Sequence, residues 1–263
     1  MCNEYLEESM DEEQLQKLIS SLCILSKDGS IPLIEIIPST VHTFTVLVSA
    51  APCEKLAHHL HQRWLSEANF TKIAARIILH HQHMHETDLG LFSCCLGHVL
   101  SDFQFRQQIR QENRLVFRNS VRVMFDFYPV YKQIDATVSE CLVEPIFTSL
   151  RELINDDPDE KDIEAAAELI IDYGNVLMKI EPDKCNNFIT ALRAHLCDSH
   201  LSSITRRLIL QALDFWTYKW NDENFPFCIK QFNETSAQIR KNPKETSQVP
   251  SQSITDKNDH HAV

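Results

Sequence analysis

The chain has 263 residues, of which 43% are hydrophobic and 24% are charged, and its formal net charge is -12. This length and composition suit one large globular domain or two small ones, each able to bury a core. The acidic balance disfavours nonspecific binding to nucleic acid or to an anionic membrane, because the summed charge repels phosphate.

Glycine is scarce in this sequence. The chain contains only 4 glycines, whereas average usage would supply about eighteen. Hairpin turns need glycine for positive φ, and the phosphate-binding loops of nucleotide enzymes need several glycines close together. We therefore predict a mostly helical fold.

Apolar residues recur with a helical period in about ten segments that pair along the chain. The pairs repeat about every 35 to 45 residues, close to the period of HEAT repeats. We predict an all-α superhelix, a HEAT-like solenoid of about five antiparallel helix pairs. The expected breaks lie near Ser26, Ala51, Ala68, Thr87, Asn113, Asp135, Asp156, Pro182 and Ser199.

The N-terminal part divides into an acidic start and an apolar window. Residues 1–10 are expected to form a flexible acidic terminus without the basic and apolar regions of a signal peptide. The window 31–51 is interrupted by Glu35, Pro38 and His42, so it does not fit a membrane span. Nine cysteines without a C-x-x-C pair indicate reduced thiols. We expect a cytoplasmic protein, with the nucleus as a second compartment.

Histidines gather between residues 58 and 85. His81 and His85 share a helix face, and Cys94 or Cys95 could add a third ligand, but the spacings match no standard zinc site. Histidines near a helix C-terminus are also favoured by the helix dipole. We expect no metal and no cofactor. The group comprises His58, His59, His61, His80, His81, His83 and His85.

Cys94, His98 and Asp102 are spaced by four residues and form one stripe of a predicted helix. A thiol, an imidazole and a carboxylate in this order resemble a nucleophilic triad. A helix interior offers no free amide donors for an oxyanion, so we expect a packed cysteine beside an ion pair instead.

Five arginines spaced by four residues form a local positive band, here called the arginine ladder: Arg106, Arg110, Arg114, Arg118 and Arg122. On one straight helix they would wrap almost halfway round, so a flat patch requires a break near Asn113. The ladder could bind RNA phosphate or an acidic partner segment. Alternatively, its side chains cover Phe105, Ile109 and Phe117 or pair with acidic residues of adjacent repeats.

The acidic run at residues 155–160 predicts a helix start. Asp157 would cap the helix, Pro158 would be its first residue, and Glu160 would complete a capping box. The alternative is an acidic docking site.

The C-terminal part holds one apolar segment and a polar tail. Residues 204–220 are apolar on most sides, which predicts a buried helix. Residues 233–263 are expected to be a disordered polar tail, because they offer little apolar surface to bury. Residues 11–232 would then form the helical domain.

Sequence motifs of common enzymes are missing. The chain contains no P-loop, no H-E-x-x-H, no G-x-S-x-G and no EF-hand loop. We expect a protein that is not an enzyme.

Four blocks of the sequence resemble the middle domain of eukaryotic initiation factor 4G, in the same order and with similar spacing. The resemblance is greatest to short single-domain members, such as the histone stem-loop-binding-protein-interacting protein and the poly(A)-binding-protein-interacting proteins. It spans about residues 11–220. The blocks are NFTKIAARIIL, LSDFQFRQQIRQENR followed by VRVMFDFYPVYKQ, LIIDYGNVL with Gly174 and Leu177, and LILQALDFWTYKW with Trp220.

This resemblance implies a crescent of five HEAT-like helix pairs that acts as a non-catalytic scaffold in messenger RNA translation. The implied partners are translation initiation factors, a DEAD-box RNA helicase or a messenger-RNA-binding protein, and short members of the family suggest homodimers. Arg106 and Arg110 fall where such proteins carry basic residues. The alternative function is a direct RNA-binding module that uses the arginine ladder.

Overall fold

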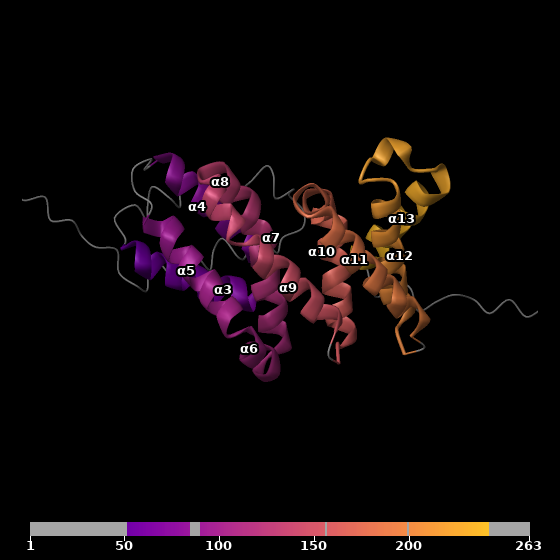
Figure 1. The fold of residues 1–263 in the computed structure, drawn as a ribbon, viewed down its shortest axis with the longest axis horizontal. Coiled ribbons are helices and arrows are strands. Elements are labelled where there is room, and N and C mark those ends of the chain that lie inside the picture. The colour runs from indigo at the N-terminus through magenta and orange to yellow at the C-terminus, as the bar shows by residue number, and fades with distance from the viewer. Residues whose placement is uncertain (1–51, 85–89, 156, 199, 242–263) are drawn as a thin grey trace, which may run out of the picture.

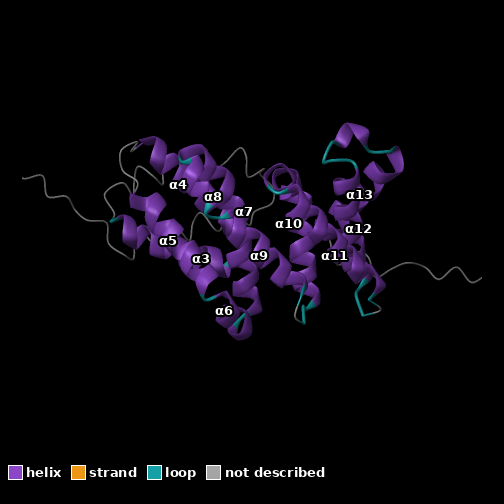
Figure 2. Cartoon of the chain, viewed as in Figure 1, coloured by secondary structure: helices purple, strands orange, loops and turns teal. Residues whose placement is uncertain are grey.

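The computed structural model describes residues 52–84, 90–155, 157–198 and 200–241, and these residues are helical with short connections and contain no strand (Figures 1 and 2). The all-α prediction is confirmed for these ranges. The helices are α3 (Cys53–Ser66), α4 (Phe70–Met84), α5 (Gly90–Gln104), α6 (Arg106–Glu112), α7 (Arg114–Ile134), α8 (Ala136–Glu140), α9 (Val143–Ile154), α10 (Glu160–Ile180), α11 (Pro182–Ala194), α12 (Ser203–Thr217) and α13 (Phe227–Lys241), with the 3-10 turns η1 (His195–Cys197) and η2 (Asp222–Asn224).

The longer helices stack in two layers. Helices α3, α5, α9 and α11 supply one layer, and α4, α7, α10 and α12 supply the other. Within the layers, α3 packs on α5, α4 on α7, and α10 on α12, while α7 also contacts α9 and α10 across the junction (Figure 1). Successive helix pairs thus bury apolar faces against each other, as in helical solenoids.

The described ranges contain four helix pairs, which begin at Cys53, Gly90, Val143 and Pro182. Their starts are separated by 37, 53 and 39 residues. Two of these spacings agree with the predicted period, and the longer one includes the extra short helices α6 and α8. The first predicted pair falls within residues 1–51, outside the described residues.

Helix α7 is the centre of the core. Its aromatic side chains Phe117, Phe127 and Tyr131 are fully buried, and Phe127 meets Trp64 of α3 edge to face with ring centroids 5.1 Å apart. Aromatic side chains bury a large apolar area, and edge-to-face pairs add further stabilisation. This packing fixes α7 against helices of its own layer and of the other layer.

Local sequence signals explain several breaks within the described ranges. The side chain of Asn113 accepts hydrogen bonds from the amides of Leu115 and Val116, so α6 ends and α7 begins at the predicted break. Asp135 caps α8 in the same way, and Pro182 is the first residue of α11. The predicted breaks near Ser26, Ala51, Thr87, Asp156 and Ser199 involve residues outside those described.

The start of α10 differs from the prediction by two residues. The cap is Asp159, not Asp157, and Asp162 completes the capping box. Asp157 adopts a positive φ of 62°, which excludes it from a capping geometry. Glu160 instead accepts hydrogen bonds from the backbone amide of Ser202 and the hydroxyl of Thr205, and so ties α10 to α12.

The predicted buried helix at residues 204–220 is α12, but only one of its faces is buried. Leu208, Ile209 and Ala212 are buried, whereas Ile204 and Leu210 are exposed. The expectation of burial on most sides was therefore wrong, because a helix at the end of the stack has a neighbouring pair on one side only.

After α12 the chain reverses and closes against α10. Lys219 and Trp220 have positive φ values of 55° and 54°, and the Trp220 indole donates a hydrogen bond to the carbonyl oxygen of Ile170. The ring covers Gly174, where an added Cβ would lie 1.9 Å from Trp220 Cζ2. Gly174 is therefore required for close packing in the middle of α10.

The predicted boundary of the polar tail at residue 233 is wrong. Helix α13 runs through it to Lys241. The connection that leads into α13 is anchored by Phe225, which packs edge to face on Phe215 and Tyr218. The rest of the predicted tail lies outside the described residues.

The described ranges can be compared with the predictions of reduced thiols and of no membrane span. The cysteines at 53, 94, 95, 141, 185, 197 and 228 are free thiols. Among the helices described, none has the length and apolar character to cross a bilayer.

Candidate docking surface and arginine ladder

The structure brings the arginine ladder together along the junction between successive helix pairs. Arg106 and Arg110 lie on α6, and the other three lie on α7 after the break at Asn113. All five turn toward α9, α10 and the connection between them. The break prevents the wrapping that one continuous helix would impose.

The two α6 arginines contact α9 and the residue that follows it. Arg106 forms an ion pair with Glu152, with Nε 3.0 Å from Oε1, and its guanidinium lies over the Phe103 ring. Arg110 is only 8% exposed and donates a 2.9 Å hydrogen bond to the carbonyl oxygen of Asn155. Arg110 therefore satisfies a carbonyl at the end of α9.

Two of the α7 arginines converge on one buried carboxylate. Asp162 is fully buried in the first turn of α10, and Arg114 Nη1 and Arg118 Nη1 lie 2.9 Å and 2.8 Å from its two oxygens. Arg118 also pairs with the capping residue Asp159 at 3.2 Å. Buried carboxylates need such partners, because an unpaired charge in the interior is costly.

The last arginine pairs at the surface. Arg122 Nη2 lies 2.9 Å from Glu168 Oε2 on α10. All members of the ladder therefore contact acceptors of the next helix pair. The structure supports the alternative in which the arginines pair with acidic residues of adjacent repeats. Binding of a partner or RNA by these side chains stays a prediction.

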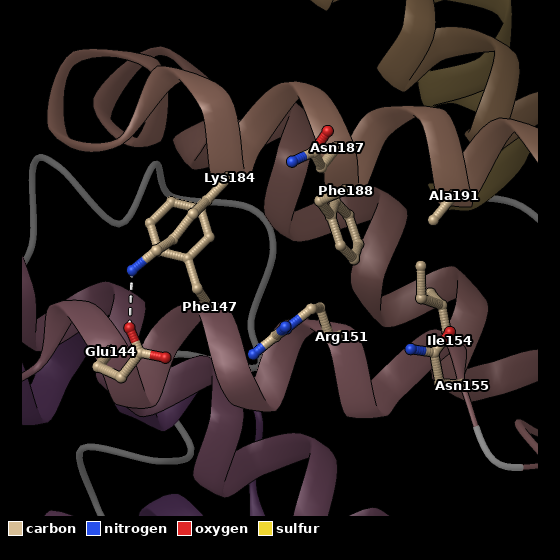
Figure 3. A pocket seen from close by; sticks show the side chains of 9 residues that line it. All are labelled: Glu144, Phe147, Arg151, Ile154, Asn155, Lys184, Asn187, Phe188 and Ala191. Carbon is tan, nitrogen blue, oxygen red and sulfur yellow. Dashed lines mark hydrogen bonds and ion pairs between the residues drawn. The ribbon is translucent and has the colours of Figure 1, made fainter.

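A hollow lies between α9 and α11, two neighbouring helices of the same layer (Figure 3). Its volume is about 230 Å³. Phe147 and Ile154 of α9 and Phe188 of α11 supply apolar surface, and Figure 3 shows Arg151 and Asn187 among the polar side chains around them. We call this hollow the α9–α11 groove. Its residues are Glu144, Phe147, Arg151, Ile154, Asn155, Lys184, Asn187, Phe188 and Ala191.

One end of the α9–α11 groove is closed by an ion pair. Lys184 Nζ donates to Glu144 Oε2 at 2.7 Å (Figure 3). This hydrogen bond lowers the pKa of Glu144 and raises the pKa of Lys184. Arg151 is exposed and forms no ion pair with the residues that the structure describes. The groove thus offers apolar surface beside the exposed positive charge of Arg151, which also acts electrostatically on Glu144.

A second hollow is polar and lies where α4, α7 and α10 meet. Asp126 of α7 is buried there and accepts hydrogen bonds from the hydroxyls of Thr71 and Tyr173. Burial raises the pKa of Asp126, and the two hydrogen bonds oppose this change. Burial and the nearby Asp126 also raise the pKa of Tyr173. The hydrogen bonds connect three helices of successive pairs.

The stripe formed by Cys94, His98 and Asp102 does not form the expected ion pair. Asp102 binds His61 of α3, with both carboxylate oxygens 3.0 Å from His61 Nε2. His98 stacks on the His61 ring with a centroid separation of 4.3 Å and an interplanar angle of 13°. The spacing within one helix could not reveal His61, which lies 41 residues before Asp102.

No protein-family model matches the chain. No curated protein matches it at a significant level.

Proposed function

We propose that this protein is a non-catalytic scaffold in messenger RNA translation that holds a protein partner on its helical stack. The expected partner is a translation initiation factor, a DEAD-box RNA helicase or a messenger-RNA-binding protein, met in the cytoplasm and in the nucleus. The resemblance of the sequence to the middle domain of initiation factor 4G suggests these partners. A homodimer belongs to the same expectation.

The two-layer stack of helix pairs is the observation that carries the proposal. Its pairs are joined by the arginine ladder, by Asp126 and by the contact of Glu160 with α12. Stacked pairs build an extended surface, and such surfaces serve other solenoids in binding. Links between successive pairs keep that surface preorganised, which reduces the entropy lost on binding.

The α9–α11 groove is the place on this surface that best suits a partner segment. The walls of the groove include the buried rings of Phe147 and Phe188, which favours an apolar side chain of the partner. The exposed guanidinium of Arg151 favours an acidic side chain beside it, because arginine binds carboxylates through two hydrogen bonds. We therefore assign the groove to a protein segment in which an acidic residue neighbours an apolar one.

The alternative function, direct RNA binding by the arginine ladder, has less support. The arginine side chains of the ladder already contact Glu152, Asp159, Asp162, Glu168 and the carbonyl oxygen of Asn155. Phosphate would have to compete with these acceptors within a chain of net charge -12.

A pull-down tests the proposal. The full chain is used as bait in a nuclease-treated cell lysate, and the captured proteins are identified by mass spectrometry. We expect an initiation factor, a DEAD-box helicase or a messenger-RNA-binding protein to be recovered without RNA. Recovery of none of these classes would contradict the scaffold function.

A charge-reversal variant tests the assignment of the α9–α11 groove separately from the scaffold function. Arg151→Glu should reduce capture of that partner at least about tenfold, since a like charge at the groove repels an acidic segment. Arg193→Glu is the matched control, because Arg193 is an exposed arginine of α11 that does not line the groove. Equal capture by both variants would remove the groove assignment and leave the scaffold function standing.

A further inference from the structure

The packing of α3 on α5 gathers three histidines at the surface of the N-terminal half of the described structure. His58 and His61 lie one helical turn apart on α3, and His98 comes from α5. One potential ligand atom from each residue lies within 4.8 Å of the other two. Among the described residues this is the one group of three or more histidine, cysteine and acidic side chains that comes so close.

We propose that His58, His61 and His98 form a binding site for a divalent transition-metal ion of the zinc class. Neutral imidazole nitrogen is a preferred ligand of these ions, and three imidazoles with one open position are a known zinc arrangement. Nitrogen ligands of tetrahedral zinc lie about 3.3 Å apart, since each is about 2.0 Å from the metal. The three ligand atoms lie within 4.8 Å of one another, and small side-chain rotations can adjust that separation to the tetrahedral value.

Asp102 supplies the second feature that metal sites require. In the neutral tautomer of His61 whose Nε2–H donates to the Asp102 carboxylate, Nδ1 is the ring nitrogen that can bind a cation. Histidine ligands of zinc are commonly oriented by such a carboxylate, which also raises their basicity. Asp102 is only 8% exposed and is therefore held in place. It acts as a positioning residue.

Aromatic packing holds the His61 ring in place. Trp64 of α3 lies against it with ring centroids 5.2 Å apart. The His98 ring also stacks on it, with ring centroids 4.3 Å apart.

His58 is exposed and would supply the third ligand from the solvent side of the site. His58 Nε2 lies 2.9 Å from the amide nitrogen of Gln62, a surface contact that a metal ion can replace at little cost. The ion would join α3 to α5, and thus the first described helix pair to the second. Binding to the folded state alone would then raise the melting temperature.

Zinc titration of the full chain, prepared without a polyhistidine tag, tests the site. Competition with a chromophoric chelator should show one Zn²⁺ bound per chain and an increase in melting temperature. His61→Asn and His98→Asn should each weaken binding at least about tenfold, and Asp102→Asn should weaken it about ten- to a hundredfold. His200→Gln is the matched control, because His200 is exposed and remote from this group, and it should bind zinc unchanged.

Two further measurements keep the test decisive. His58 is exposed, so His58→Gln should fold normally even if the other variants do not, and it should also lose affinity. Co²⁺ should give a spectrum without thiolate-to-metal charge transfer. Unchanged zinc affinity in His58→Gln and His98→Asn, or a thiolate band that disappears in Cys94→Ser, would overturn the proposal.

Discussion

At the residue scale, Gly174 and Trp220 show how one side chain can close a helical stack. The indole lies where a Cβ on residue 174 would be, at 1.9 Å from Cζ2, and its nitrogen binds the carbonyl oxygen of Ile170. The sequence suggested both residues through the family resemblance. Only the structure shows that they contact each other.

Gly174→Ala should lower the free energy of unfolding by about 1 to 3 kcal/mol, because the added methyl group displaces the Trp220 ring. Urea unfolding followed by tryptophan fluorescence measures the change. Gly97→Ala is the matched control, since Gly97 lies in α5 with nothing within 4 Å of its would-be Cβ. The control should gain up to about 1 kcal/mol from helix propensity. Equal effects at the two positions would contradict the packing argument.

Asp126 should make stability depend on pH. Its pKa is raised in the folded state by burial, so the folded protein binds the proton more tightly than the unfolded chain. The contribution of this group to stability is therefore greatest below the unfolded pKa, about 3.9, and is lost as the pH rises through the folded pKa.

Asp126→Asn removes this titration. The free energy of unfolding of the variant, relative to the native sequence, should increase between about pH 4 and about pH 7. Urea unfolding of both proteins at the two pH values provides the measurement. A difference that stays constant or decreases over this interval would show that Asp126 does not titrate as described.

At the scale of the elements, the arginine ladder joins α6 and α7 to α9 and α10. Asp162 has two roles there: it completes the capping box of α10 and it neutralises Arg114 and Arg118. Glu168 pairs with Arg122 at a more exposed place, with a side-chain exposure of 37%. The buried carboxylate of Asp162 should therefore contribute more to the free energy of unfolding than the partly exposed carboxylate of Glu168.

Asp162→Ala should lower the free energy of unfolding by about 3 to 5 kcal/mol, because it leaves two arginines without their buried partner. Glu168→Ala should cost less than about 1 kcal/mol, as is usual for exposed ion pairs. Thermal and urea unfolding of both variants give the comparison. If the two substitutions cost the same, the buried carboxylate does not hold the junction together.

At the scale of the whole molecule, charge and pairing act together against RNA binding. The chain carries a net charge of -12, and the arginine ladder within it contacts carboxylates and a carbonyl oxygen of the next helix pair. We therefore expect the surface of the stack to bind protein partners better than phosphate.

A fluorescence anisotropy titration checks this conclusion. A labelled single-stranded RNA at about 0.15 M salt should show no saturable binding below about 10 μM protein, weaker than many nonspecific complexes. Binding in the nanomolar range that falls steeply with salt and is lost in Arg106→Glu would instead support the RNA-binding alternative.

The sequence by itself determined the helical class of the described ranges and the breaks near Ala68, Asn113, Asp135 and Pro182. Scarce glycine and a 3.6-residue apolar period are local properties, and caps such as Asn113 and Asp135 act on amides two or three residues away. Where several neighbouring acidic residues could cap the same helix, the prediction was wrong. Asp159 caps α10, and Asp157 does not. The extent of α13 was also missed, because its polar sequence offers only a weak periodic signal.

Only the tertiary structure decided what the functional candidates contact. The acceptors of the arginine ladder lie more than 40 residues further along the chain, and His98 meets His61 across two helices. Helical periodicity tells which residues share a face, but the stacking of helix pairs decides which faces meet. For that reason the sequence could identify the arginine ladder but could not pair it, and it missed the three-histidine group.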